Sequence, residues 1–454
     1  MEQPRPFGVR LFFCAVPWRG ILEKERGMEM ADRGKDGQDR YGCFLIVPLK
    51  YDPETLDRAA VERLGDCVPM TTMDLNENVK AMLTPPDGAA VGVGRNVSPA
   101  VLTGGLGPGA GQGDSQRFRV AHEGASFDFE LSSSWLYLFH TRVAFLCLNL
   151  SFARMEALGT ICNPGWAHNP ASFFWLDQAG EAHPFQVEEW LADFLRPLGL
   201  RKFFDGDSSI LLDTYAYIFS VVPRWFDELA PMRKITFNLH KMMPPDAPME
   251  DEAEEDIRYV YAARNREKNA YRWGCCIASQ TISYVVADEN MDFEAQRAAQ
   301  AADGLPVVLL SLYEKYTCLR FTELITRMKK NQVKELKELM LRFQAFGTVA
   351  PANLSRWHNV KQIYANLLEV NDIPSAVGDI SAKLNILTAH QEEVQHARSE
   401  TVINIITLFG IVSILASVLS IVQILSDGSA LIWISMILTA VMLALVTVLA
   451  ILRR

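Results

Sequence analysis

The chain has 454 residues, of which 49% are hydrophobic and 22% charged, and a mean hydropathy of +0.05, slightly high for a soluble globular protein. Its 44 Lys and Arg residues against 54 Asp and Glu give a net charge of −10. This acidic balance excludes a protein that binds nucleic acid by bulk electrostatics, and the length allows about three domains.

The first 300 residues alternate strand-like and helix-like segments. β-branched and aromatic runs bounded by turn residues predict strands at 9–16, 42–49, 127–131, 142–152, 173–176 and 277–286. Helices are expected at 53–64, 187–195 and 211–225. This mixture predicts an α/β or α+β N-terminal cytosolic domain over residues 1–300.

Two low-complexity segments interrupt this domain. The Gly- and Pro-rich segment 84–114 predicts a disordered insertion, and it carries no phosphate-binding motif. Segment 249–256 is rich in Asp and Glu and is more typical of a mobile acidic loop than of a cation site. The eight cysteines form no C-x-x-C pair, and no histidine or serine lies in a catalytic motif, so we expect neither an enzyme nor a bound cofactor.

Residues 305–400 predict a helical region that ends in a long stalk. A heptad seam with alternating spacings of four and three is formed by Ile373, Val377, Ile380, Leu384, Leu387, Gln391 and Val394. Neither Pro nor Gly lies between Gly378 and Gly410, so the helix is expected to continue into the apolar segment that follows. The seam predicts a coiled-coil stalk of a homo-oligomer; the alternative is one amphipathic helix packed on its own domain.

The C-terminal end contains two runs without charged residues, 401–426 and 428–452, separated by Asp427. A bilayer core needs about 20 apolar helical residues, so the runs predict two transmembrane helices, at 401–426 and 429–452. Arg453 and Arg454 close the second run, and the connecting loop has no basic residue. The expected protein is therefore multi-pass in the plasma (inner) membrane, with the lipid bilayer as partner and both termini cytoplasmic.

Small and polar residues recur every three or four positions along the first run. They are Asn404, Thr407, Gly410, Ser413, Ser417 and Ser420. This stripe is interpreted either as a pore-lining face or as a surface for close helix packing. Gln423 and Asp427 follow it and are candidates for a pore mouth, although Asp427-Gly428 is also ordinary turn chemistry.

This layout resembles the CorA family of divalent-cation transporters. The best local likeness covers roughly the last third of the chain and runs through Leu312-Tyr313-Glu314-Lys315-Tyr316 into the stalk and the two apolar runs. The resemblance implies a homopentamer, with the first transmembrane helices around a central pore. The family's Gly-Met-Asn signature is absent, and its place is held by Gln423-Ile424-Leu425-Ser426-Asp427-Gly428.

From the resemblance we expect a channel or transporter for divalent cations such as Mg2+, with those ions as cargo or gating ligands. One alternative is a ligand-gated membrane effector on the same scaffold, like the CorA-type proteins associated with CRISPR defence. Another is a membrane-anchored scaffold without a pore. In each case we expect a homo-oligomer and no nucleic-acid partner.

Overall fold

The computed structural model describes residues 40–72, 74–83, 91–163, 170–206, 209–224, 226–249, 256–262, 270–288, 292–327 and 332–425, and four single residues, Trp433, Met436, Ile437 and Ala440. The chain divides into two compact units, Met1–Gly378 and Asp379–Arg454. The strand expected at 9–16 and most of the acidic segment 249–256 lie outside the described residues.

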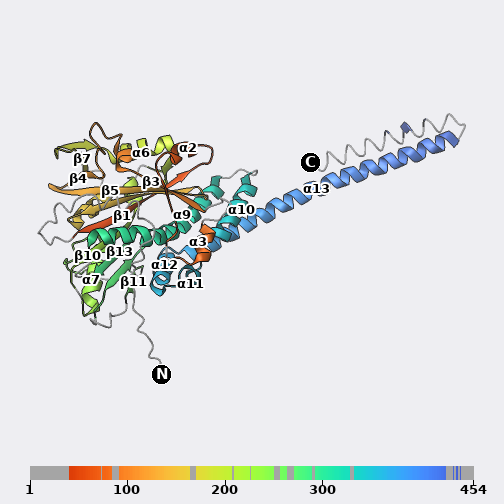
Figure 1. The fold of residues 1–454 in the computed structure, drawn as a ribbon. Coiled ribbons are helices and arrows are strands. Elements are labelled where there is room, and N and C mark those ends of the chain that lie inside the picture. Colours follow the sequence, from red (N-terminus) through yellow and green to blue (C-terminus); the bar gives the residue numbers. More distant parts are fainter. Residues whose placement is uncertain are drawn as a thin grey trace, which may run out of the picture. The chain divides into compact units, whose positions relative to one another are not determined.

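The first unit is built on a 13-stranded mixed sheet (Figure 1). The main path of the sheet runs β11 (Arg258–Tyr261), β12 (Trp273–Ile277), β13 (Thr281–Ala287), β10 (Tyr215–Val222), β1 (Tyr41–Tyr51), β6 (Val143–Phe152), β5 (Ala125–Phe139), β4 (Gln116–His122), β7 (Ser172–Leu176) and β8 (Ala182–Phe185). Off this path, β2 (Cys67–Val68) pairs with β3 (Gly92–Val97), β3 also pairs with β5, and β9 (Leu200–Lys202) pairs with β1. Strands β10 and β13 run parallel, and the other described pairs are antiparallel.

Strand β1 lies at the centre of the sheet, and all of its residues are buried. Side chains alternate between the two faces of a strand, so a strand without exposed residues is covered on both sides. Cys43 and Leu45 belong to the main apolar core, whereas Phe44 packs edge-on against Trp135 and Tyr217. The nearly continuous apolar sequence of β1 follows from this double coverage.

Helices lie on both faces of the sheet and at its ends (Figure 1). Their bounds are α2 (Arg58–Glu62), α3 (Glu77–Leu83), α4 (Pro99–Thr103), α5 (Met155–Cys162), α6 (Val187–Leu195), α7 (Leu229–His240), α8 (Phe293–Ala299), α9 (Leu305–Arg327), α10 (Val333–Arg342), α11 (Pro351–Leu354) and α12 (His358–Val370). Helix α9 contacts β1 and β6, and α7 contacts β12 and β13. Short 3-10 turns η1 (Arg196–Leu198) and η2 (Ile210–Asp213) precede β9 and β10, while π-helical turns occur at η3 (Gln300–Gly304) and η5 (Phe343–Gly347).

Local structure differs from expectation in three places. The helix expected at 211–225 is the turn η2 followed by β10, because the buried, aromatic and β-branched run from Tyr215 to Val222 fits a central strand. The single strand expected at 277–286 is a hairpin of β12 and β13, with a tight turn at Ser279 and Gln280. The described part of 84–114 contains β3 and α4 rather than loop alone.

Helix α13 (Ile373–Leu425) is continuous over 53 residues, as the absence of Pro and Gly between Gly378 and Gly410 predicted. Ile373, Ile380 and Leu384, three positions of the heptad seam, are buried. The coiled-coil stalk of a homo-oligomer stays a prediction.

The expected membrane hairpin is wrong. Within the part of the chain that the structure describes, no helix is both long enough and apolar enough to cross a bilayer. The run 401–425 is the second half of α13, whose first half carries charged residues, and nearly all of 429–452 lies outside the described residues. This finding corrects the expected fold class with two transmembrane helices and the multi-pass plasma-membrane localisation with cytoplasmic termini. Nothing in the described residues supports the channel and magnesium-transport assignments.

Candidate functional site

The residues expected to line a pore all lie on α13. Asn404, Thr407, Gly410, Ser413, Ser417 and Ser420 are exposed along several turns of this helix. The hydroxyls of Thr407, Ser417 and Ser420 each donate to the carbonyl oxygen one turn earlier, at 2.8, 2.8 and 2.9 Å. Such hydroxyls are satisfied by their own helix and need no outside partner. The Gln423 side chain and the whole of Asp427 lie outside the described residues.

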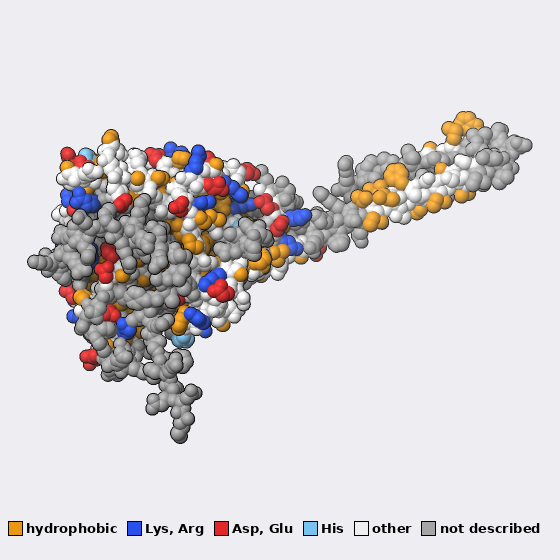
Figure 2. Space-filling view, viewed as in Figure 1, with side chains coloured by type: hydrophobic (Ala, Val, Ile, Leu, Met, Phe, Trp, Pro, Cys, Tyr) orange, Lys and Arg blue, Asp and Glu red, His pale blue; other side chains and the backbone are white. Residues whose placement is uncertain are grey.

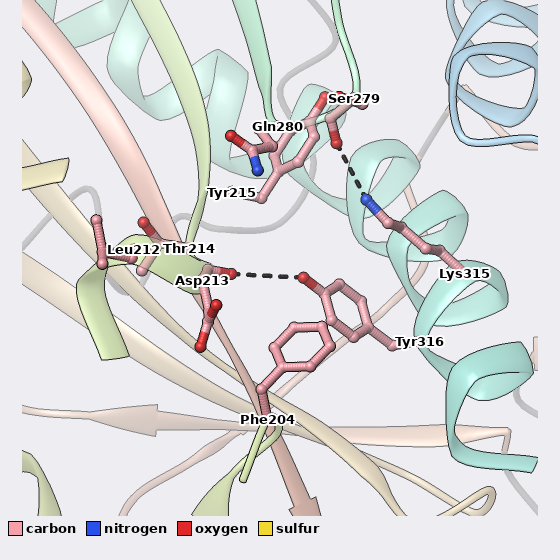
Figure 3. A pocket seen from close by; sticks show the side chains of 9 residues that line it. All are labelled: Phe204, Leu212, Asp213, Thr214, Tyr215, Ser279, Gln280, Lys315 and Tyr316. Carbon is pink, nitrogen blue, oxygen red and sulfur yellow. Dashed lines mark hydrogen bonds between the residues drawn. The ribbon is translucent and has the colours of Figure 1, made fainter. Parts of the chain in front are cut away.

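A cavity of about 180 Å³ opens in the first unit between η2, β10, the β12–β13 turn and α9 (Figure 3). Its lining consists of Phe204, Leu212, Asp213, Thr214, Tyr215, Ser279, Gln280, Lys315 and Tyr316. Aromatic rings and polar groups therefore alternate around one small space. Such a mixed lining offers both ring faces and polar groups to a molecule that enters the pocket.

Local sequence fixes the walls of the pocket. Ser209 caps η2 by accepting a hydrogen bond from the amide of Leu211 at 3.2 Å, which brings Asp213 and Thr214 to the start of β10. On the opposite side, Ala278 donates to the carbonyl oxygen of Thr281 at 2.8 Å and closes the tight turn. Figure 3 shows Lys315 and Tyr316 projecting from α9 toward these two segments.

Lys315 is the cation of the pocket. Its Nζ donates to the carbonyl oxygen of Ser279 at 3.1 Å and lies 5.8 Å from the centre of the Tyr316 ring. Burial lowers the pKa of this lysine from 10.5 to about 8. The ammonium forms no ion pair with a carboxylate of the described residues, so burial is not offset by an opposite charge. At pH 7 roughly one amine in ten is neutral.

Asp213 is the acidic group of the pocket and lies across it from Lys315 in Figure 3. Burial raises its pKa, with Lys202 acting in the opposite direction and Glu188 adding to the rise. Its Oδ2 is buried and has no hydrogen-bond partner among the described residues, while its backbone oxygen accepts from the Tyr316 hydroxyl at 3.5 Å. An unpaired buried carboxylate oxygen is unusual and marks a place where a ligand donor gains energy.

The remaining polar groups of the lining are mostly engaged within the protein. The Thr214 hydroxyl donates to the carbonyl oxygen of Leu211 at 2.8 Å, and the Tyr215 hydroxyl to that of Ala278 at 3.4 Å. Gln280 is exposed at the rim of the pocket. One amine and one carboxyl group do not form a metal-ligand set, so the pocket suits an organic ligand rather than a metal ion.

Sequence reasoning included Lys315 and Tyr316 in the family resemblance but did not assign them to a site. The available signal was the charged pair Glu314-Lys315 in the largely apolar first half of α9, where burial of a charged group carries a desolvation cost. Asp213 was hidden because its segment was assigned to a helix. The pocket forms only when η2, the β12–β13 turn and α9 meet, and their spacing in the sequence does not reveal this.

In comparisons with known proteins, no family model, curated protein or solved structure matches this chain. The resemblance to the CorA family therefore stays an expectation from the sequence.

Proposed function

We propose that this chain is a ligand-binding protein whose sheet unit holds a small organic carboxylate in the pocket of Lys315. The observation that carries the proposal is the half-buried ammonium of Lys315, which lines a cavity of mixed aromatic and polar groups and has no carboxylate partner among the described residues. A ligand carboxylate would supply the missing charge and regain part of the desolvation cost.

The other side of the pocket narrows the class of ligand. Lys315 uses one of its three N–H donors on Ser279, which leaves donors for a ligand anion. Asp213 offers a buried oxygen without a partner, so a hydroxyl or amino group on the same ligand would be favoured there. The cavity of about 180 Å³ lies below the roughly 300–1,000 Å³ typical of drug-sized ligands, so the ligand is small. These features support 2-hydroxy- or 2-amino-carboxylates with an apolar side chain.

Calorimetry with paired probes tests this proposal. L-valine, L-phenylalanine and lactate are titrated into the protein, together with the methyl esters of the two amino acids, which lack the anion. Binding of at least one acid and loss of that binding with its ester, or at least a tenfold loss in Lys315→Met, is expected. Lys334→Met, at an exposed position of α10, is the matched control. Equal binding by wild type and Lys315→Met, or no binding of any acid, would contradict the proposal.

A second candidate function, self-association, is favoured by the surface of α13. Eight apolar side chains on this helix are 40–66% exposed, namely Val402, Ile403, Ile405, Ile406, Phe409, Ile411, Ile414 and Val418 (Figure 2). An apolar surface of this extent marks a contact surface, and residues this close in sequence cover more than one side of a helix. Identical helices from further copies would bury this surface, so we propose a homo-oligomer joined through this part of α13.

A further inference from the structure

The hairpin of β7 and β8, at the end of the sheet path, carries a group of metal-ligating side chains around its turn. Asp177 and Glu181 pair through their backbone, with the Asp177 amide donating to the Glu181 carbonyl oxygen at 3.0 Å. Gly180, with φ of +84°, provides the left-handed residue that this turn needs. His183 follows on β8, opposite Trp175 of β7.

The side chains of Asp177, Glu181 and His183 converge. One ligand atom from each lies within 4.8 Å of those of the other two. The Asp177 Oδ2 and His183 Nε2 atoms are 3.3 Å apart. Ligand atoms at 2.0–2.1 Å from a tetrahedral ion lie about 3.3–3.4 Å from one another. A metal ion can therefore replace the proton between Asp177 and His183 without moving either backbone.

Two contacts orient the ligands before any ion arrives. The His183 ring stacks on the Trp175 ring with centroids 4.3 Å apart and planes at 22°. The backbone amide of Glu181 donates to Asp177 Oδ1 at 2.8 Å, which turns Oδ2 toward the histidine. Such supporting contacts fix ligand geometry in metal sites. Glu181 is exposed, so its carboxylate can complete the set by rotation about its side-chain torsions.

We propose that Asp177, Glu181 and His183 form a binding site for a divalent transition metal, of the zinc type, on the β7–β8 turn. One imidazole and two carboxylates are a set that Zn2+ accepts, whereas Mg2+ and Ca2+ prefer oxygen ligands alone. The site is partly exposed, which leaves a fourth position open to water or to a ligand from outside. None of its residues lines the Lys315 pocket, so this inference is independent of the function proposed above.

Titration of the full chain with ZnCl2, followed by calorimetry, tests the site. The wild type is expected to bind Zn2+ at this site, and His183→Gln to bind it at least tenfold more weakly. His358→Gln, at an exposed position at the start of α12, is the matched control and should bind as the wild type does. MgCl2 is expected to give no heat of binding at this site.

Fluorescence gives a second readout that does not depend on stability. Cu2+ quenches a tryptophan that stacks on its ligand, so it is expected to quench part of the emission in the wild type and less in Trp175→Phe and His183→Gln. Circular dichroism shows whether each variant is folded. Equal Zn2+ affinity in the wild type and a folded His183→Gln, or no Zn2+ binding by the wild type, would overturn the proposal.

Discussion

Lys50 Nζ donates to Glu323 Oε1 at 2.9 Å, although the lysine side chain is only 2% exposed and lies on the central strand of the sheet. This pair joins β1 to α9. Glu323 also accepts from Arg320 at 2.8 Å and from Arg327 at 2.9 Å, and Lys50 has a second partner in Asp205 at 3.1 Å. The network holds the helix that carries Lys315 against the sheet, so it underlies the pocket.

Loss of the Glu323 charge is expected to destabilise the fold. Burial acts to raise the pKa of Glu323, but hydrogen bonds from Lys50 and Arg320 lower it overall, so the group is ionised at neutral pH. Glu323→Gln leaves Lys50 and Arg320 buried with one anion fewer, and about 3 kcal/mol of unfolding free energy should be lost. Urea denaturation at pH 7 measures the change.

Glu338→Gln is the control for this prediction, because Glu338 is exposed on α10. Its unfolding free energy should stay within about 0.5 kcal/mol of the wild type. A Glu323→Gln variant as stable as this control would show that the buried network contributes nothing to the attachment of α9.

Glu314, the neighbour of Lys315 in the sequence, predicts a pH-dependent stability. It is 3% exposed, accepts hydrogen bonds from the Tyr364 hydroxyl and, at 3.3 Å, from the Val349 amide, and burial raises its pKa from 4.5 to about 7. A raised folded pKa favours the fold at pH values below the unfolded pKa, and this contribution is lost as the pH rises from 4.5 to 7. The wild type should therefore lose up to about 3 kcal/mol over this range relative to Glu314→Gln.

Urea midpoints of both proteins at pH 4.5, 6 and 8 check the sign as well as the size. The difference between Glu314→Gln and wild type should grow in favour of the variant up to pH 7 and then level off. A difference that is constant with pH, or that shrinks, would mean that Glu314 is ionised in the folded protein at acidic pH.

The exposed apolar surface of α13 predicts an assembly that charge can disrupt. Ile406 and Phe409 are 64% and 59% exposed, so the double variant Ile406→Glu, Phe409→Glu removes apolar contacts without disturbing a buried core. Light scattering coupled to size exclusion should give an oligomeric mass for the wild type and a lower mass for this variant. A monomeric wild type, or an unchanged mass in the variant, would contradict self-association through α13.

The sequence predicted several central strands and the continuity of α13 but not the site. Apolar runs such as Tyr41–Tyr51 and Val143–Phe152 are central strands, and their composition shows it. A similar apolar run at Tyr215–Val222 was wrongly predicted as a helix, because periodicity does not distinguish a short buried helix from a buried strand. The apolar run after 401 favoured a membrane hairpin because of its length and its lack of charge, but no helix among the described residues is long and apolar enough to cross a bilayer.

The pocket could not be predicted from the sequence because its lining residues come from separate segments of the chain. Asp213, Ser279 and Lys315 belong to segments far apart in the chain, and only the parallel pairing of β10 with β13 and the packing of α9 bring them together. Burial lowers the pKa of Lys315, and the sequence does not show which lysines the fold removes from water.

The pKa of Lys315 tests the central claim most directly. Amine acylation followed by mass spectrometry gives the midpoint of reactivity for each lysine between pH 6 and 11, with Lys334 as an exposed reference in the same sample. Without ligand, Lys315 should titrate near 8. A bound carboxylate stabilises the ammonium, so the tightest-binding acid should raise the Lys315 midpoint by at least one pH unit and leave Lys334 unchanged. A Lys315 midpoint at the ordinary lysine value of 10.5, or one that no acid shifts, would contradict a carboxylate site in this pocket.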